Sequence, residues 1–256
     1  MIDQKALIDP GARLGNGAKV GPFTIIEDDV EIGDDTEIGS HCVIRSGTRI
    51  GKSNRISQFC SIGDEPQHLG YAGEPTKLEI GDRNTIREYC TINRGSTCSD
   101  GVTRVGNDNF FMAYVHIAHD CKVSNHTIFA NAASLAGQVE VGDNVIFGGF
   151  SLVHQFCKIG PHCITGIGSV IVKDVSPFVV CAGNPAKVHG INIKGLKRRG
   201  FGEDRILDIK RAYRVVFREG LEVKTALTRL SEQARDNPDI AMWSAFLENS
   251  TRGVVR

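Results

Sequence analysis

The sequence predicts an all-β solenoid, a parallel β-helix of hexapeptide repeats, followed by a C-terminal α-helical domain. Three observations favour this fold class. An aliphatic residue recurs at every sixth position from Ile2 to Ile62. Glycine is in excess, at 29 of 256 residues, whereas proline is scarce at 8, which indicates repeated tight turning rather than disorder. After residue 190 the apolar spacing changes to the helical period of about 3.6 residues.

A period of six is too short for a helical hairpin and is typical of a parallel β-helix, in which one hexad forms a short strand and a turn. Three strands close a triangular coil of 18 residues, with the periodic aliphatic side chain at the axis and a small residue two positions earlier. Stacked coils, about 4.8 Å apart, bury each other's apolar edges. The first uninterrupted run of aliphatic sites is Ile2, Ile8, Leu14, Val20, Ile26, Ile32, Ile38, Ile44, Ile50, Ile56 and Ile62.

The hexad register is interrupted twice. It fails after Ile62, where the chain is rich in glycine, proline and polar residues, and it slips by one residue after Ile92. These breaks predict excursion loops near 63–79 and 94–104 on a β-helix domain that spans residues 1–190. Loops inserted into a rigid scaffold are common sites of function.

Residues 191–256 are predicted to form a helical domain, with Asn237 and Pro238 as the cap and first turn of its last helix. Residues 191–220 carry nine basic and four acidic side chains, a net charge of +5, whereas residues 1–40 have a net charge of −6. The basic segment suits a diphosphate or an acidic protein partner, and a solvated helix face is the alternative. The apolar positions with helical spacing are Ile206, Ile209, Tyr213, Val216, Phe217, Leu221, Ala226, Leu227, Leu230, Ile240, Trp243 and Phe246.

The composition excludes several functional classes. Thirty basic residues balance 30 acidic ones, which argues against bulk electrostatic binding to nucleic acid or to an anionic membrane. The uncharged stretch 144–157 is far shorter than the roughly 20 apolar residues of a transmembrane helix. The segment Met1–Lys5 has no apolar run of a secretory signal, so we expect a cytoplasmic protein without a transmembrane segment.

Most cysteines fall at the small-residue position of a hexad, and none shows the C-x-x-C spacing of a zinc or redox site. We therefore expect buried, reduced thiols and no metal site. The cysteines at these positions are Cys42, Cys60, Cys90, Cys121, Cys157 and Cys163.

Histidines cluster at one place along the predicted solenoid. His119, Gly137 and Gln155 are 18 residues apart and should lie in one column, with His116 and His154 close by. An imidazole there suits a general base, and a glycine directly over it leaves space for substrate and offers a backbone N–H to an oxyanion. The alternative is that these imidazoles only cap solvated edges.

No nucleophile accompanies the histidine cluster. Ser151 and Cys157 fall on inward positions of the hexads, so neither side chain should reach a substrate on the outer face. Direct attack by one substrate on the other, assisted by a base, is therefore favoured over a covalent intermediate.

Several longer motifs are similar to the UDP-N-acetylglucosamine acyltransferases of lipid A biosynthesis, and the similarity runs essentially end to end. It implies a left-handed β-helix, a homotrimer with active sites between neighbouring prisms, and no cofactor. It also implies transfer of an (R)-3-hydroxyacyl group from acyl carrier protein to the sugar 3-hydroxyl of UDP-N-acetylglucosamine. The motifs are residues 63–75, 116–121, 153–156, 195–201 and 250–253.

The resemblance also implies roles for individual residues. His119 would be the general base, Asp120 its orienting partner, and Gly137 the source of the oxyanion N–H. The arginines 198 and 199 would contact the substrate through phosphate. The full set implied to bind substrate is Gln67, His68, His116, Gln138, His154, Gln155, Asn192, Arg198 and Arg199.

Four positions depart from the family pattern. His68 and Gly70 stand where the family commonly has Asp and Lys, Gln138 replaces a His, and Lys194 replaces an acid. These changes surround the sugar and acyl ends of the site, so a UDP-3-amino sugar, which would give an amide, is an alternative acceptor.

One position bears on the length of the acyl chain. Ile167 stands where a glycine in the family allows long chains, and its branched side chain fills the volume of several methylenes, each worth about 0.8 kcal/mol of burial. This predicts acyl groups nearer about ten carbons than fourteen. The alternative is that Ile167 packs at the trimer seam.

Three other functions compete with this interpretation. A related N-acyltransferase would need a longer domain before the hexads, whereas here the repeat begins at Ile2. A metal-dependent hydratase would need His116, His119 and His154 to converge on one metal. A non-catalytic solenoid would keep its full function without His119.

Overall fold

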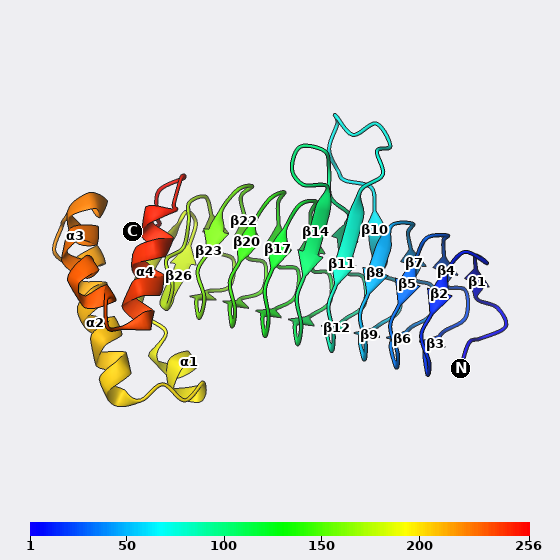
Figure 1. Cartoon of the computed structure of the whole chain (residues 1–256), viewed down its shortest axis with the longest axis horizontal. Coiled ribbons are helices and arrows are strands. Elements are labelled where there is room, and N and C mark those ends of the chain that lie inside the picture. The colour runs from blue at the N-terminus through cyan, green and yellow to red at the C-terminus, as the bar shows by residue number, and fades with distance from the viewer.

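The computed structural model describes residues 1–256, with the exception of the side chain of Glu232. It is a long three-sided prism with helices gathered at its C-terminal end (Figure 1). Successive strands lie on successive faces, so each sheet collects every third strand. The predicted six-residue step therefore becomes one side of a triangular coil.

Sheet 1 contains β1 (Leu7–Ile8), β4 (Ile25–Ile26), β7 (Val43–Ile44), β10 (Ser61–Asp64), β13 (Thr91–Asn93), β16 (His116–Ile117), β19 (Ser134–Leu135), β22 (Leu152–Val153) and β25 (Val170–Ile171). Sheet 2 contains β2 (Arg13–Leu14), β5 (Glu31–Ile32), β8 (Thr48–Ile50), β11 (Lys77–Ile80), β14 (Val102–Val105), β17 (Lys122–Val123), β20 (Glu140–Val141) and β23 (Lys158–Ile159). Sheet 3 contains β3 (Lys19–Val20), β6 (Glu37–Ile38), β9 (Arg55–Ile56), β12 (Thr85–Ile86), β15 (Phe110–Phe111), β18 (Ile128–Phe129), β21 (Ile146–Phe147), β24 (Ile164–Thr165), β26 (Val179–Gly183) and β27 (Ala186–Ile191).

The strands of neighbouring coils pair in parallel and keep the inward aliphatic residues in register. Ile117 of β16 lies opposite Leu135 of β19, and both are buried. Three successive inward positions of sheet 3 are aromatic, and the ring centroid of Phe129 lies 5.0 Å from that of Phe111 and 4.5 Å from that of Phe147. The core is thus a dry column along the axis of the prism.

The turns between strands form three edges, which we call corner 1–2, corner 2–3 and corner 3–1 after the sheets that they join. Most turns contain one residue in the left-handed region, such as Asp120 (φ 61°) and Gln138 (φ 61°) on corner 1–2. Non-glycine residues rarely adopt this conformation, and here the backbone hydrogen bond from each corner to the adjacent coil holds it, as from the Gln138 N–H to the His119 carbonyl at 3.0 Å.

Both excursion loops replace turns of corner 1–2, and they rise side by side from one edge of the prism (Figure 1). The first loop spans 65–76, between β10 and β11, and the second spans 94–101, between β13 and β14. These loops are shorter than the expected ranges 63–79 and 94–104, because four residues of β11 pair with β14 and extend the sheet into the base of each loop.

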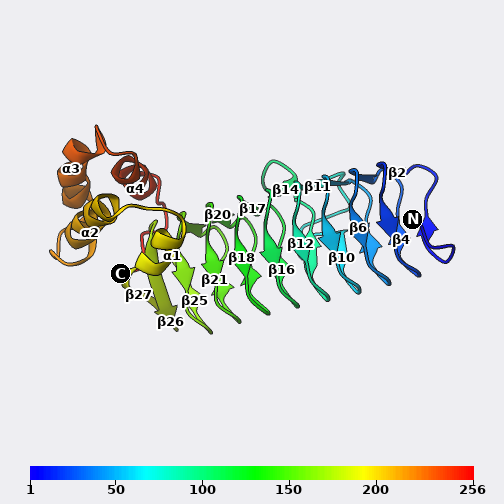
Figure 2. The same cartoon turned by 90° about the horizontal axis from the view of Figure 1, so that it is seen from below.

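The C-terminal helices are α1 (Ile193–Arg198), α2 (Glu203–Phe217), α3 (Val223–Ala234) and α4 (Pro238–Glu248), and Figure 2 shows them at the end of the prism that carries β26 and β27. Asn237 caps α4 by accepting hydrogen bonds from the N–H groups of Asp239 and Ile240, with Pro238 in the first turn, as predicted. Trp243 of α4 is buried against Phe178, which covers the last coil. No helix among the described residues is long and apolar enough to span a bilayer.

The six cysteines at small-residue positions are all buried. Burial raises the pKa of the Cys121 thiol to about 12, and it raises the pKa of Cys181 to about 12 as well. These two thiols therefore stay protonated at neutral pH and do not act as nucleophiles.

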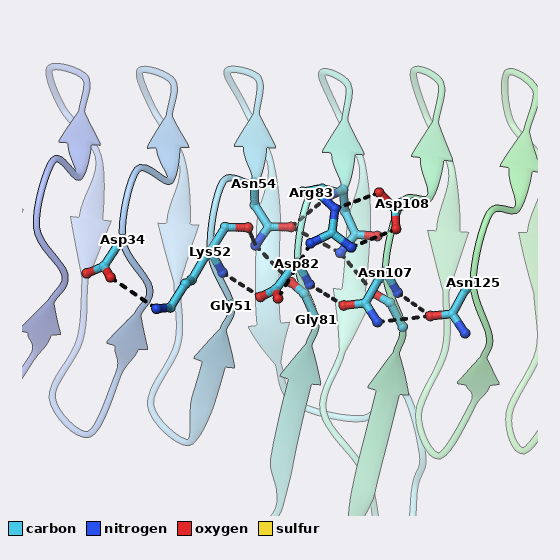
Figure 3. A network of polar contacts seen from close by, with 12 residues as sticks. Asp34, Gly51, Lys52, Asn54, Gly81, Asp82, Arg83, Asn107, Asp108 and Asn125 are labelled. Carbon is cyan, nitrogen blue, oxygen red and sulfur yellow. Dashed lines mark hydrogen bonds and ion pairs between the residues drawn. The ribbon is translucent and has the colours of Figure 1, made fainter.

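A ladder of buried asparagines ties successive coils together at the start of the sheet 3 strands. The backbone N–H of Asn84 donates to Asn54 Oδ1 at 2.9 Å, and the N–H of Asn109 donates to Asn84 Oδ1 at 2.9 Å. The Asn84 amide group also donates to the carbonyl of Gly106 at 2.9 Å. Figure 3 shows Asn54 beside an outer ladder on corner 2–3, in which Asn107 accepts from the N–H of Asp82.

Replacing Asn84 with alanine is expected to lower the free energy of unfolding by about 2–4 kcal/mol, because the Asn109 N–H and the Gly106 carbonyl lose their partner inside the core. The matched control is Arg83→Ala, which removes a half-exposed pair with Asp108 at 2.8 Å and should cost far less than Asn84→Ala, because solvent screens the pair. Urea unfolding followed by circular dichroism measures both losses. Equal losses would contradict the structural role of the ladder.

Candidate active site

A groove of about 430 Å³ lies on the outer face of sheet 1, where it meets corner 1–2 and the first excursion loop. Its floor includes apolar residues of β22, Leu152 and Val153. Six of the residues selected from the sequence line it: Gln67, His68, His116, His119, Gly137 and Gln155.

The hexad register explains why His119 faces this groove. Ile117, the last residue of β16, points to the axis and is fully buried. The chain then leaves the strand and reverses at Asp120, whose backbone is left-handed. His119 therefore projects outward from corner 1–2, with 12% of its side chain exposed.

His119 and Asp120 form a hydrogen-bonded pair. His119 Nδ1 lies 2.7 Å from Asp120 Oδ2, and the carboxylate side chain is fully buried. Since a carboxylate only accepts hydrogen bonds, Nδ1 carries the hydrogen and the lone pair is left on Nε2. His119 Nε2 has no hydrogen-bond partner among the described residues, so it is free to accept a proton.

Gly137 lies directly over the imidazole of His119. A Cβ atom at this position would lie 2.6 Å from His119 Cε1 and 2.7 Å from Nε2, closer than any real contact. The glycine was expected to leave space for substrate, but the structure fills this space with the imidazole ring itself. The Gly137 N–H has no acceptor within the described part of the chain, so it is available to an oxyanion.

The first excursion loop brings His68 against His119. The two ring centroids lie 5.6 Å apart at an interplanar angle of 57°. A Cβ at Gly70 would lie 2.9 Å from the His68 ring, so glycine at 70 makes room for the histidine at 68. The departures from the family pattern at His68 and Gly70 therefore belong to one local arrangement, in which the glycine makes room for the histidine ring.

His116 lies on the outer face of β16, beside the catalytic candidate. Its Nδ1 is 2.7 Å from the hydroxyl of Thr91 on β13. Burial, and then repulsion from His119, lowers the pKa of His116 below its ordinary value. The ring is therefore uncharged at neutral pH and suits hydrogen bonding to a substrate rather than charge neutralisation.

Ser96, which the sequence analysis did not select, contacts the carboxylate of Asp120. Its N–H donates to Oδ1 at 2.8 Å and its hydroxyl donates to Oδ2 at 2.6 Å. Ser96 belongs to the second excursion loop, so the register slip was the only signal that pointed toward this part of the chain.

The structure does not bring the remaining selected residues into the groove of the same chain. Asn192 caps α1 by accepting from the Gly195 N–H at 3.0 Å, and its amide group donates to the carbonyl of His162 at 2.9 Å. Arg198 ends α1 and is exposed, and Arg199 donates to the carbonyl of His126, at 3.4 Å. Since α1 packs on corner 2–3, these residues lie at a different edge from His119.

Three further residues selected from the sequence also lie outside the lining of the groove. Gln138 occupies the left-handed position that follows Gly137. His154 is exposed, and its Nδ1 lies 3.1 Å from the carbonyl of Gln155. Ile167 projects from corner 3–1, and its side chain is 83% exposed. Among the described residues, no group of three or more metal-ligating side chains converges.

Comparison with known proteins decides the family. A model described as UDP N-acetylglucosamine O-acyltransferase, domain 2, matches residues 174–255, and a bacterial transferase hexapeptide model matches residues 11–46. The acyl-[acyl-carrier-protein]–UDP-N-acetylglucosamine O-acyltransferases of Thiobacillus denitrificans and Halorhodospira halophila are 51% and 54% identical over 255 residues, covering 100% of this chain and 99% of each relative. The chain belongs to the UDP-N-acetylglucosamine O-acyltransferase family.

Structures of this family superpose along the whole chain. LpxA from Acinetobacter baumannii has a TM-score of 0.97 at 43% identity, covering 100% of this chain and 99% of the other. The acyltransferase of Francisella novicida has a TM-score of 0.98 at 39% identity, covering 100% and 94%. The predicted left-handed parallel β-helix of hexapeptide repeats with C-terminal helices is confirmed, and the chain is an acyltransferase.

Proposed function

We propose that the chain transfers an (R)-3-hydroxyacyl group from acyl carrier protein to the 3-hydroxyl of UDP-N-acetylglucosamine, in the cytoplasm, as the first step of lipid A biosynthesis. The relatives described above carry acyl carrier protein and UDP-N-acetylglucosamine in their names. The observation that carries the chemistry is the His119–Asp120 pair at 2.7 Å beneath Gly137. This arrangement supplies a base, a group that orients it, and a free N–H.

In the proposed mechanism, His119 Nε2 accepts the proton of the sugar 3-hydroxyl while that oxygen attacks the thioester carbonyl. Asp120 accepts the Nδ1–H and stabilises the imidazolium that forms. The N–H of Gly137 donates to the oxyanion of the tetrahedral intermediate. The C–S bond then breaks, an ester C–O bond remains, and the imidazolium returns the proton to the departing thiolate of the carrier.

A homotrimer would complete the site, because Asn192, Arg198 and Arg199 lie away from His119 within one chain and a second copy would supply them. An exposed aromatic column on corner 3–1 supports assembly, since a surface of this kind is rare on a monomer. The ring centroids of its successive members, Phe23, His41, Phe59, Tyr89 and Tyr114, lie 4.9–5.3 Å apart.

The test of the proposed function is incubation with UDP-N-acetylglucosamine and a set of 3-hydroxyacyl carrier proteins, with products identified by mass. Light scattering on the same sample should give the mass of a trimer. We propose that no cofactor is needed, so prior treatment with a chelator should leave product formation unchanged. Loss of product formation on chelation, restored by a metal, would contradict this.

A UDP-3-amino sugar is the second candidate acceptor, favoured by His68 and Gln138, which stand where the family has Asp and His. An amine acceptor yields an amide and a hydroxyl acceptor yields an ester, and mild alkali cleaves only the ester. Offering both acceptors in competition and treating the products with alkali distinguishes the two proposals.

We propose that Ile167 limits the acyl chain, so the native enzyme should use a ten-carbon donor better than a fourteen-carbon one. Replacing Ile167 with glycine is expected to shift this preference toward fourteen carbons by about tenfold or more, since each buried methylene is worth about 0.8 kcal/mol. The control is Leu207→Ala, which truncates a side chain that is 45% exposed on α2. Native turnover of the longer donor that equals or exceeds that of the shorter one would defeat the idea.

A further inference from the structure

The carboxylate of Asp120 is held by the second excursion loop. Ser96 donates its N–H to Oδ1 at 2.8 Å and its hydroxyl to Oδ2 at 2.6 Å. The N–H of Asp120 itself donates to the hydroxyl of Thr103, at 2.7 Å, where this loop rejoins the prism. Ser96 and Asp120 are only 1% and 2% exposed, so water does not compete for these bonds.

One oxygen of this carboxylate receives two hydrogen bonds. Asp120 Oδ2 accepts from the Ser96 hydroxyl at 2.6 Å and from His119 Nδ1 at 2.7 Å. In a buried site, a donor on a carboxylate oxygen withdraws negative charge that would otherwise stabilise the neighbouring imidazolium. The hydroxyl of Ser96 therefore weakens the stabilisation that Asp120 gives to the imidazolium form of His119.

We propose that Ser96 is a positioning residue for catalysis, which fixes the carboxylate of Asp120 and limits how strongly that carboxylate stabilises the imidazolium form of His119. This inference rests on the proposed function, because it assumes that His119 is the base. It assigns to the second excursion loop a role in the reaction, through a residue that does not line the groove.

Other titratable groups face this pair from the surrounding elements. His68 approaches from the first excursion loop, His116 from β16, and Cys121 follows Asp120 in the chain. Burial keeps the Cys121 thiol protonated and lowers the pKa of His116, so neither group adds charge at neutral pH. The contribution of His68 is removed from the comparison by measuring Ser96 variants in the native and the His68→Asn backgrounds.

The test compares the pH dependence of kcat/KM for acyl transfer in the Ser96→Ala and native enzymes. Without the hydroxyl, the pH of half-maximal rate on the acidic side should rise by about 0.5–1 unit, in both backgrounds, because the imidazolium is better stabilised. The rate on the alkaline plateau should fall by no more than about tenfold. Ser96→Thr, which keeps a hydroxyl, should restore the native profile.

The matched control is Thr97→Ala, which removes the neighbouring hydroxyl of the same loop, one that contacts Glu74 rather than Asp120. It should leave the profile unchanged. A Ser96→Ala profile that falls in height without moving along the pH axis would overturn the inference and show a merely structural role. A wild-type chain without acyl transfer, or full activity in His119→Ala, would instead overturn the proposed function.

Discussion

Replacing His119 with alanine should lower kcat/KM for acyl transfer by at least about 10³-fold, with the fold intact. The lone pair that the His119–Asp120 pair directs toward the groove lies on the imidazole, and among the described residues no other base is hydrogen-bonded to Asp120. The loss should appear in kcat more than in KM, since proton transfer occurs in the transition state. Initial rates measured by mass detection of the acylated sugar nucleotide check this.

The control for His119 is His126→Asn, which removes an exposed imidazole from a left-handed position on corner 2–3. Asparagine tolerates this backbone conformation, so the variant should fold and turn over at the native rate. Circular dichroism of both variants establishes that the solenoid is retained. A His119→Ala enzyme with more than about one tenth of the native rate is incompatible with general base catalysis by this residue.

Adding one methyl group at Gly137 should lower kcat/KM by about 10²–10³-fold. An alanine Cβ would lie 2.6 Å from His119 Cε1 and 2.7 Å from Nε2, so the imidazole must move. This movement breaks the hydrogen bond of 2.7 Å between His119 Nδ1 and Asp120 Oδ2. It also turns Nε2 away from the hydroxyl of the sugar that accepts the acyl group. Single-turnover kinetics should place the loss in the chemical step.

The matched control for Gly137 is Gly202→Ala, at the N-cap of α2, where a Cβ meets no atom within 4 Å and φ is −66°. It should keep the native rate. A further arm is the double variant Gly137→Ala with His119→Ala, which should be no slower than His119→Ala alone, because the added methyl group acts through the imidazole. Additive losses would mean that Gly137 acts independently of His119.

The fold was largely predictable because the solenoid is built from contacts that repeat with the sequence. Ile117 and Leu135 are 18 residues apart and lie opposite each other in sheet 1. The same spacing predicted that His119 and Gly137 stack. The ladder of buried asparagines at 54, 84 and 109 was not predicted. Its hydrogen bonds join residues of three stacked coils, and a polar residue at a small-residue position does not indicate them by itself.

The candidate site was predictable only in part. The column argument found His119 and Gly137, and the family resemblance added Asp120. Neither pointed to Ser96, because the path of a loop without periodicity is set by the surface on which it packs. The short helix α1 was not predicted either, and its cap by Asn192 gives a structural role to a residue selected for substrate binding.

The sequence by itself determined the triangular coil, the parallel stacking of successive coils and the corner from which His119 projects. The reason is that a six-residue step leaves each side chain one orientation relative to the axis. Only the tertiary structure decided that the imidazole of His119 fills the space next to the Cα of Gly137. It also decided that Ser96 and His119 both donate a hydrogen bond to Asp120 Oδ2. The contact of Ser96 with Asp120 joins an aperiodic loop to a periodic coil, so no repeat encodes it. The hexad spacing places His119 and Gly137 in one column, but the orientation of the imidazole depends on its hydrogen bond to Asp120 and on the packing around it.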